Sequence, residues 1–130
     1  MHSPDQRAAI DAYKTSSIEH APGIKIVRML YEGALRFLDR AIAAGGDDPE
    51  FGVWISRADA IVLELRLSID ESHAPELSSN LHDLYLFCEQ NLTRAVQERA
   101  TAPVQEARDV LDTLLQAWKS LELDGKGAGA

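Results

Sequence analysis

Four prolines divide most of the chain into segments of similar length, and each stands at the start of a run with helical periodicity. Proline fits the first turn of a helix, because the backbone N–H that it lacks would have no partner there. These residues are Pro22, Pro49, Pro75 and Pro103. The sequence therefore predicts four long helices, over residues 22–44, 48–69, 75–99 and 103–121.

The residues between these segments supply the helix ends. Gly45 and Gly46 can take the left-handed conformation that ends the first helix, and Asp48 can cap the first free amides of the second. Short connections leave consecutive helices antiparallel. A chain of 130 residues, 45% hydrophobic and only 6% aromatic, suits a single helical core better than a β-sandwich. We expect an all-α fold, an antiparallel up-down four-helix bundle with a short N-terminal helical arm.

Two short extensions flank the bundle domain, which we place at residues 20–122. Residues 1–19 form an N-terminal arm and joint, in which a short helix can present Ile10 and Tyr13. This arm is too short to fold alone. Residues 123–130 are rich in Gly and Ala, and we expect them to be a disordered tail.

One of the four predicted helices has more apolar surface than a bundle can bury. The others are ordinary amphipathic helices with one apolar face. In the second helix, Val53, Ala60, Leu63 and Leu67 lie roughly opposite the inward face, and Leu86 of the third helix also points outward. The residues that we expect to face inward are Val27, Leu30, Tyr31, Ala34, Phe37, Leu38, Ala41, Phe51, Trp54, Ala58, Ile61, Val62, Leu65, Ile69, Leu77, Leu81, Leu84, Tyr85, Cys88, Leu92, Ala95, Val104, Ala107, Leu111, Leu114, Leu115 and Trp118.

The second apolar stripe predicts that another segment of the chain or another protein covers it. Each Leu or Val that leaves water contributes on the order of 1.5 to 3 kcal/mol, and several in line form a patch that favours contact. Either the N-terminal arm or a partner helix could cover the stripe. The second helix could instead be sandwiched between neighbours, or these residues could be single exposed aliphatics of the ordinary kind.

No constellation of catalytic or metal-binding residues stands out. The Glu-x-x-His spacing of di-iron bundles is absent, and the four histidines are scattered. His82 faces outward as in a phosphotransfer bundle, but the adjacent Asp83 would repel phosphate. Cys88 lies on an inward face, where a thiol is inert. We expect a non-enzyme without cofactor or metal.

The net charge and the cysteine content limit the kinds of partner and the cellular compartment that we expect for this protein. A net charge of −8 without a basic cluster argues against nucleic acid. A lone cysteine excludes an internal disulfide and fits a reducing compartment. The sequence has no apolar signal region at its start and no stretch long enough to span a membrane. We expect a cytoplasmic protein.

The run from His20 to Leu38, HAPGIKIVRMLYEGALRFL, resembles the first-helix signature of the FliS family of flagellin-specific export chaperones. Its most specific part is Met29-Leu30-Tyr31-Glu32-Gly33. Similar patterns occur at residues 65–70, at Asn80-Leu81 with Leu84-Tyr85, and at residues 114–118, which end on a Trp. A Tyr in the arm before a polar joint, here Tyr13, is also typical. The resemblance covers about residues 8–121, nearly the whole chain.

The resemblance implies a cytoplasmic chaperone that binds the C-terminal helical segment of flagellin. It implies that the chaperone prevents premature polymerisation and delivers flagellin to the flagellar type III export apparatus. Further implied partners are a component of the export gate and a co-chaperone or regulator. The arm would fold over part of the groove when flagellin is absent. The partner-binding residues that we predict are Ile10, Tyr13, Val53, Leu63, Leu67 and Leu86.

Two alternatives use the same helices differently. In a self-associating helical adaptor, the apolar stripe would form the seam of a homodimer, whereas an export chaperone should be a monomer or a weak homodimer. In a phosphotransfer bundle, His82 would carry the phosphoryl group.

Overall fold

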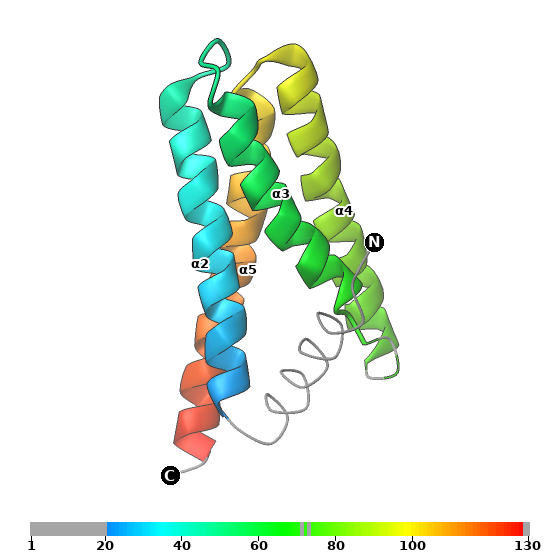
Figure 1. The fold of residues 1–130 in the computed structure, drawn as a ribbon. Coiled ribbons are helices and arrows are strands. Elements are labelled where there is room, and N and C mark those ends of the chain that lie inside the picture. Colours follow the sequence, from blue (N-terminus) through cyan, green and yellow to red (C-terminus); the bar gives the residue numbers. More distant parts are fainter. Residues whose placement is uncertain (1–20, 71, 73, 129–130) are drawn as a thin grey trace.

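The computed structural model describes residues 21–70, 72 and 74–128, and within them it contains four helices and no strand (Figure 1). The helices are α2 (Ala21–Ala44), α3 (Phe51–Leu67), α4 (Pro75–Glu98) and α5 (Ala102–Ala128). Each packs on two neighbours, since α2 contacts α3 and α5, and α4 also contacts α3 and α5. Consecutive helices run in opposite directions. The predicted all-α, antiparallel four-helix bundle is confirmed.

The helix ends follow from the residues that the sequence marked. Gly45 has a φ of 83°, which favours glycine, and its N–H donates to the Ala41 carbonyl at 3.0 Å. Asp48 accepts a hydrogen bond from the N–H of Glu50 at 2.8 Å, in the turn that precedes α3. The predicted cap of α3 by Asp48 was wrong, because the helix begins only at Phe51 and its N-cap residue is Glu50. Helix α4 begins at Pro75, as predicted. The predicted starts and ends therefore hold to within a few residues, except at the end of α5.

Helix α5 continues to Ala128, whereas the sequence predicted an end at residue 121. Residues 123–128, which we assigned to a disordered tail, are helical. Adding a residue to a formed helix costs little, and the helix continues here although Gly125 and Gly127 have low helix propensity. The arm, residues 1–19, lies outside the described residues, so the assignment of residues 1–19 remains a prediction.

The core is a single cluster contributed by all four helices. Most of the expected inward residues belong to it or pack partly buried against it. Leu35 and Ile55 are also core residues, with exposed fractions of 8% and 2%, although the helical patterns did not select them. The buried hydrophobic residues are Tyr31, Ala34, Leu35, Leu38, Ala41, Phe51, Ile55, Ala58, Val62, Leu65, Tyr85, Cys88, Leu92, Ala95, Val104, Ala107, Leu111 and Leu115.

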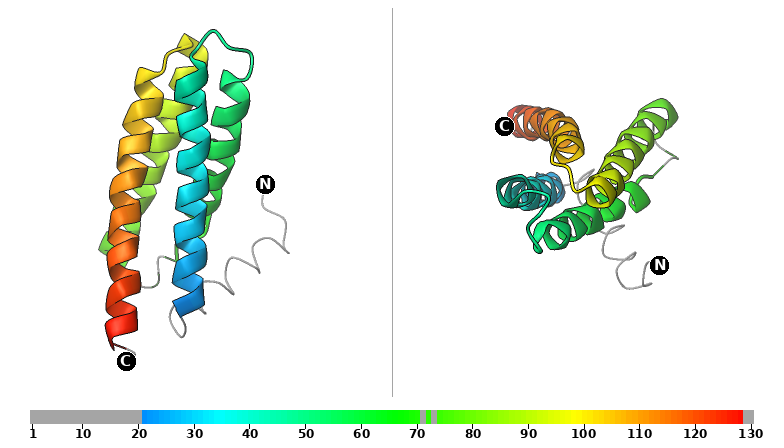
Figure 2. Two further views of the ribbon diagram at one scale, coloured as in Figure 1. Left: turned by 90° about the vertical axis from the view of Figure 1, so that its left-hand side faces the viewer. Right: turned by 90° about the horizontal axis from the view of Figure 1, so that it is seen from above.

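Two residues of α4 contradict the expected inward face. Leu77 and Leu84 are exposed, at 59% and 37%. Both lie in the first half of α4, where α3 and α4 spread away from α2 and α5 (Figures 1 and 2). Because the neighbouring helix diverges there, residues at the edge of the apolar band are left in water.

The residues that carry the family resemblance meet in the core. The hydroxyl groups of Tyr31 and Tyr85 form a hydrogen bond, and the Tyr31 ring lies 6.4 Å from the rings of both Tyr85 and Trp118, between centroids. Burial raises the pKa of both tyrosines. The thiol of Cys88 lies 3.7 Å from the Ala107 carbonyl oxygen, and burial raises its pKa to about 12. These groups therefore join α2, α4 and α5 and stay uncharged at neutral pH.

Candidate partner-binding surface

The predicted stripe on α3 is only partly exposed. Val53 has an exposed fraction of 45%, whereas Leu63, Leu67 and Leu86 are half-buried. Leu63 and Leu67 lie toward the end of α3, and Leu86 lies in the middle of α4, which packs on α3. The structure thus places these four residues on two adjacent helices. Ile10 and Tyr13 lie outside the described residues.

A groove with a volume of about 340 Å³ lies between the first half of α3 and the second half of α4. Its α3 wall contains residues three and four positions apart, which therefore share one face of the helix. Its α4 wall is mainly apolar or neutral. The lining residues are Gly52, Ile55, Ser56, Asp59, Leu92, Thr93, Val96 and Gln97. Val53 and Val96, each 45% exposed, add apolar surface at this part of the molecule.

The groove and the stripe occupy one face of the α3–α4 pair. Leu63 follows Asp59 by four residues along α3, and Leu86 precedes Thr93 by seven along α4, so helical spacing puts each on the groove side of its helix. The sequence predicted Leu63 and Leu67 as part of this face because they broke an amphipathic pattern, but it selected none of the α3 residues that line the groove. The α4 wall was missed, because Thr93 and Val96 look like ordinary surface positions.

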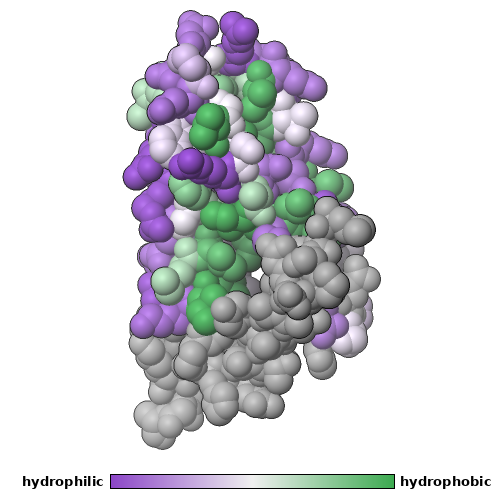
Figure 3. All heavy atoms as spheres, in the orientation of Figure 1, coloured by the Kyte–Doolittle hydropathy of each residue, from purple (hydrophilic) through white to green (hydrophobic). Residues whose placement is uncertain are grey.

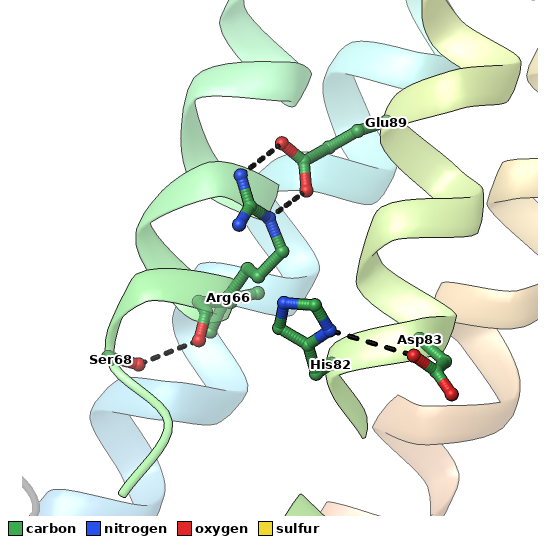
Figure 4. A network of polar contacts seen from close by, with 6 residues as sticks. Arg66, Ser68, His82, Asp83 and Glu89 are labelled. Carbon is green, nitrogen blue, oxygen red and sulfur yellow. Dashed lines mark hydrogen bonds and ion pairs between the residues drawn. The ribbon is translucent and has the colours of Figure 1, made fainter. Parts of the chain in front are cut away.

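A two-point ion pair joins α3 to α4 on this face (Figure 4). The Arg66 Nε lies 2.5 Å from Glu89 Oε2, and its Nη2 lies 3.3 Å from Glu89 Oε1. Both side chains are mostly buried, at 22% and 15% exposed. Such a paired geometry is the strong form of this contact, and it raises the pKa of Arg66. The pair fixes the spacing of the two helices beyond the groove.

Asp59 stands on the α3 wall with part of its carboxylate unpaired. Its Oδ1 is buried, and no hydrogen-bond partner for it exists in the described part of the chain. Burial raises the pKa of Asp59, the charge of Glu89 raises it further, and the charge of Arg66 opposes both. A buried polar atom without a partner is uncommon and calls for a physical reason. The sequence did not single out Asp59, although an acid beside the inward Ala58 was a usable signal.

Other apolar surface is spread over the molecule. On α4, Leu77, Leu84 and Phe87 are exposed, and on α2, Met29 is 56% exposed. Hydrophobic residues also gather over α2 and α3 on the face shown in Figure 3, with hydrophilic residues along the outer edge of α2. At this contact Gly33 packs near Ile61, since a Cβ on the glycine would lie 3.6 Å from the Ile61 Cδ1. This is an ordinary van der Waals distance, so the spacing of α2 and α3 does not require a glycine at this position.

The described residues offer little for catalysis or metal binding. Among them, no group of three or more His, Cys, Asp and Glu side chains is placed to hold a metal ion. The Nδ1 of His82 lies 3.6 Å from Asp83 Oδ1, so a carboxylate stands where a phosphoryl group would need cations (Figure 4). None of the helices in residues 21–128 is long and apolar enough to cross a membrane.

Comparisons with known proteins agree on one family. The family model described as "Flagellar protein FliS" matches residues 6–124. The flagellar secretion chaperone FliS of Campylobacter jejuni is 33% identical over 115 residues, which are 87% of this chain and 90% of the relative. The FliS of Escherichia coli is 32% identical over 107 residues, 80% of this chain and 79% of the relative. That of Vibrio cholerae is 26% identical over 121 residues, 88% and 89% of the two chains.

Proposed function

Because the chain belongs to the FliS family of flagellar proteins, we propose that it is a cytoplasmic export chaperone whose cargo is flagellin. In this proposal it binds the C-terminal helical segment of flagellin, prevents premature polymerisation and delivers the segment to the flagellar type III export apparatus. The family supports the export chaperone role. The identity of the cargo rests on the resemblance of residues 20–38 together with the apolar α3–α4 face.

The observation that carries the cargo proposal is the face formed by the groove and the stripe. It combines the exposed Val53 and Val96 with the half-buried Leu63, Leu67 and Leu86. An amphipathic helix binds such a surface by laying its apolar side along the groove between two helices. A segment that folds only on binding gives up ordering entropy, so its affinity is moderate for the area buried. Moderate affinity suits cargo that has to be released.

The arm and the other partners complete the proposal. Ile10 and Tyr13 cover part of the same surface while no flagellin is bound, and flagellin displaces them. A component of the export gate then receives the complex, and a co-chaperone or regulator adds a further contact. This function needs no cofactor and no catalytic residue, because it consists of the binding and release of flagellin.

Replacing two leucines of the stripe by aspartate tests the binding face. We expect Leu63→Asp with Leu67→Asp to weaken binding of a flagellin C-terminal segment by on the order of 100-fold. The reason is that each leucine side chain lost from the interface removes about 1.5 kcal/mol or more of binding free energy. Calorimetric titration measures the affinity, and circular dichroism checks that the bundle remains helical. Val53→Asp, at an exposed position, reports on the same face if the double variant unfolds.

The matched control places the same two charges on another apolar surface of the bundle. Leu77→Asp with Leu84→Asp changes two exposed leucines of α4 away from the groove, and should leave the affinity unchanged. Wild-type affinity in a folded Leu63→Asp, Leu67→Asp variant would contradict the assignment. A loss of affinity only in the control variant would show that the binding face lies on the other side of α4.

A further inference from the structure

The lining of the α3–α4 groove contains one charged side chain. Of the eight residues that line it in the described part of the chain, only Asp59 is ionisable as an acid or a base. The others are apolar, small or neutral polar residues. A lone carboxylate in such surroundings is costly unless something pairs with it.

A cationic side chain that could pair with Asp59 lies nearby, but it is bound to another carboxylate. Arg66 is close enough to act on the charge of Asp59, yet both of its contacts go to Glu89, at 2.5 and 3.3 Å. Asp59 Oδ1 keeps no partner among the described residues. With Asp59 and Glu89 set against Arg66, this part of the interface carries one excess negative charge.

We propose that Asp59 is the polar anchor of the groove and binds a lysine or arginine side chain carried by the helix that occupies it. The proposal rests on the proposed function, because that helix is the cargo segment. The apolar residues of the cargo helix pack on the exposed Val96, and one cationic side chain of that helix pairs with the carboxylate of the half-buried Asp59. A helix that places a cation next to its apolar stripe is thereby selected over one that is purely apolar, because only the former pairs the buried charge.

This role predicts opposite effects on stability and on binding. Asp59→Asn keeps the shape of the side chain and removes its charge. We expect the thermal midpoint at pH 7 to stay the same or rise, because burial already disfavours the ionised carboxylate. We expect the affinity for a flagellin C-terminal segment to fall about tenfold or more, as for a lost charged hydrogen bond. A purely structural carboxylate would instead lower the midpoint and leave the affinity of the folded protein unchanged.

Glu98→Gln is the matched control. It removes the same charge from α4 beside the groove residue Gln97, at a side chain that is 56% exposed. Its effect on affinity should stay within about twofold, because exposed charges are screened by salt. Equal losses in the two variants would show a general effect of charge and overturn the anchor.

Single substitutions in the flagellin segment identify the cationic residue that pairs with Asp59. Each Lys and Arg of the flagellin segment is replaced in turn by Met, and each peptide is titrated against the wild-type chain and against Asp59→Asn. We expect one position to matter for the wild type and to lose its effect in Asp59→Asn. If the wild type binds and no position couples to Asp59, the anchor is wrong and the proposed function stands. If the wild type binds no flagellin segment, the proposed function fails, and the anchor with it.

Discussion

At the scale of single residues, Gly46 lies directly against the backbone of Arg99. A Cβ built on this glycine would lie 1.8 Å from the Arg99 carbonyl oxygen and 2.4 Å from its carbon. Because both atoms are backbone, the connection between α2 and α3 has to move if a side chain is added. We expect Gly46→Ala to lower the free energy of unfolding by about 2 kcal/mol or more. Urea denaturation measures the change.

The control for this substitution is a glycine with free space around it. Gly52 lies in the first turn of α3, and a Cβ there would meet nothing within 4 Å. Alanine favours a helix over glycine, so Gly52→Ala should raise the free energy of unfolding by roughly 0.5 to 1 kcal/mol. Destabilisation by both substitutions to the same extent would argue against a specific clash at Gly46.

Asp59 makes stability depend on pH in a direction opposite to that of a typical acid. Its pKa is raised in the folded state, so the folded protein holds the proton more tightly than the unfolded chain, where the pKa is about 3.9. The unfavourable contribution of this carboxylate is present above the folded pKa and is lost as the pH falls through it. We expect Asp59→Asn to raise the thermal midpoint most near pH 7, with the gain shrinking toward pH 4. A gain that grows on acidification would show that the pKa is lowered instead.

At the scale of elements, the Arg66–Glu89 pair couples α3 to α4. Both side chains are mostly buried, so removing one leaves the other without its partner in a poorly solvated place. A double-mutant cycle with Arg66→Met and Glu89→Gln should give a coupling of about 1 to 2 kcal/mol in unfolding free energy. The matched pair is Arg94–Glu106, which joins α4 to α5 at 3.3 Å with both side chains about half exposed. There we expect less than about 1 kcal/mol.

At the scale of the whole molecule, exposed apolar residues are divided among separate surfaces. Val96 lines the groove and Val53 follows the groove residue Gly52 on α3, whereas Leu77, Leu84 and Phe87 lie elsewhere on α4. A net charge of −8 opposes self-association of the chain. We expect sedimentation at micromolar concentration to show a monomer. A dimer that Leu63→Asp with Leu67→Asp disrupts would favour the self-associating adaptor over the chaperone.

The sequence by itself determined the number of helices, most of their ends and the greater part of the core. These features depend on local conformation, such as proline in a first turn or glycine at a positive φ, and on a period that each helix carries alone. Part of the candidate site followed in the same way, because Val53, Leu63 and Leu67 broke the amphipathic pattern of α3.

Only the tertiary structure decided how the neighbouring helices meet. Helical spacing gives the angle of a residue on its own helix, but not where the next helix diverges, so Leu77 and Leu84 were placed inside and are exposed. The same limit hid the α4 wall of the groove and the Arg66–Glu89 pair, which depend on residues far apart in the sequence. The burial of Asp59 also arises from this packing, because a carboxylate at the edge of an apolar face is buried or exposed according to which residues of the neighbouring helix lie opposite it.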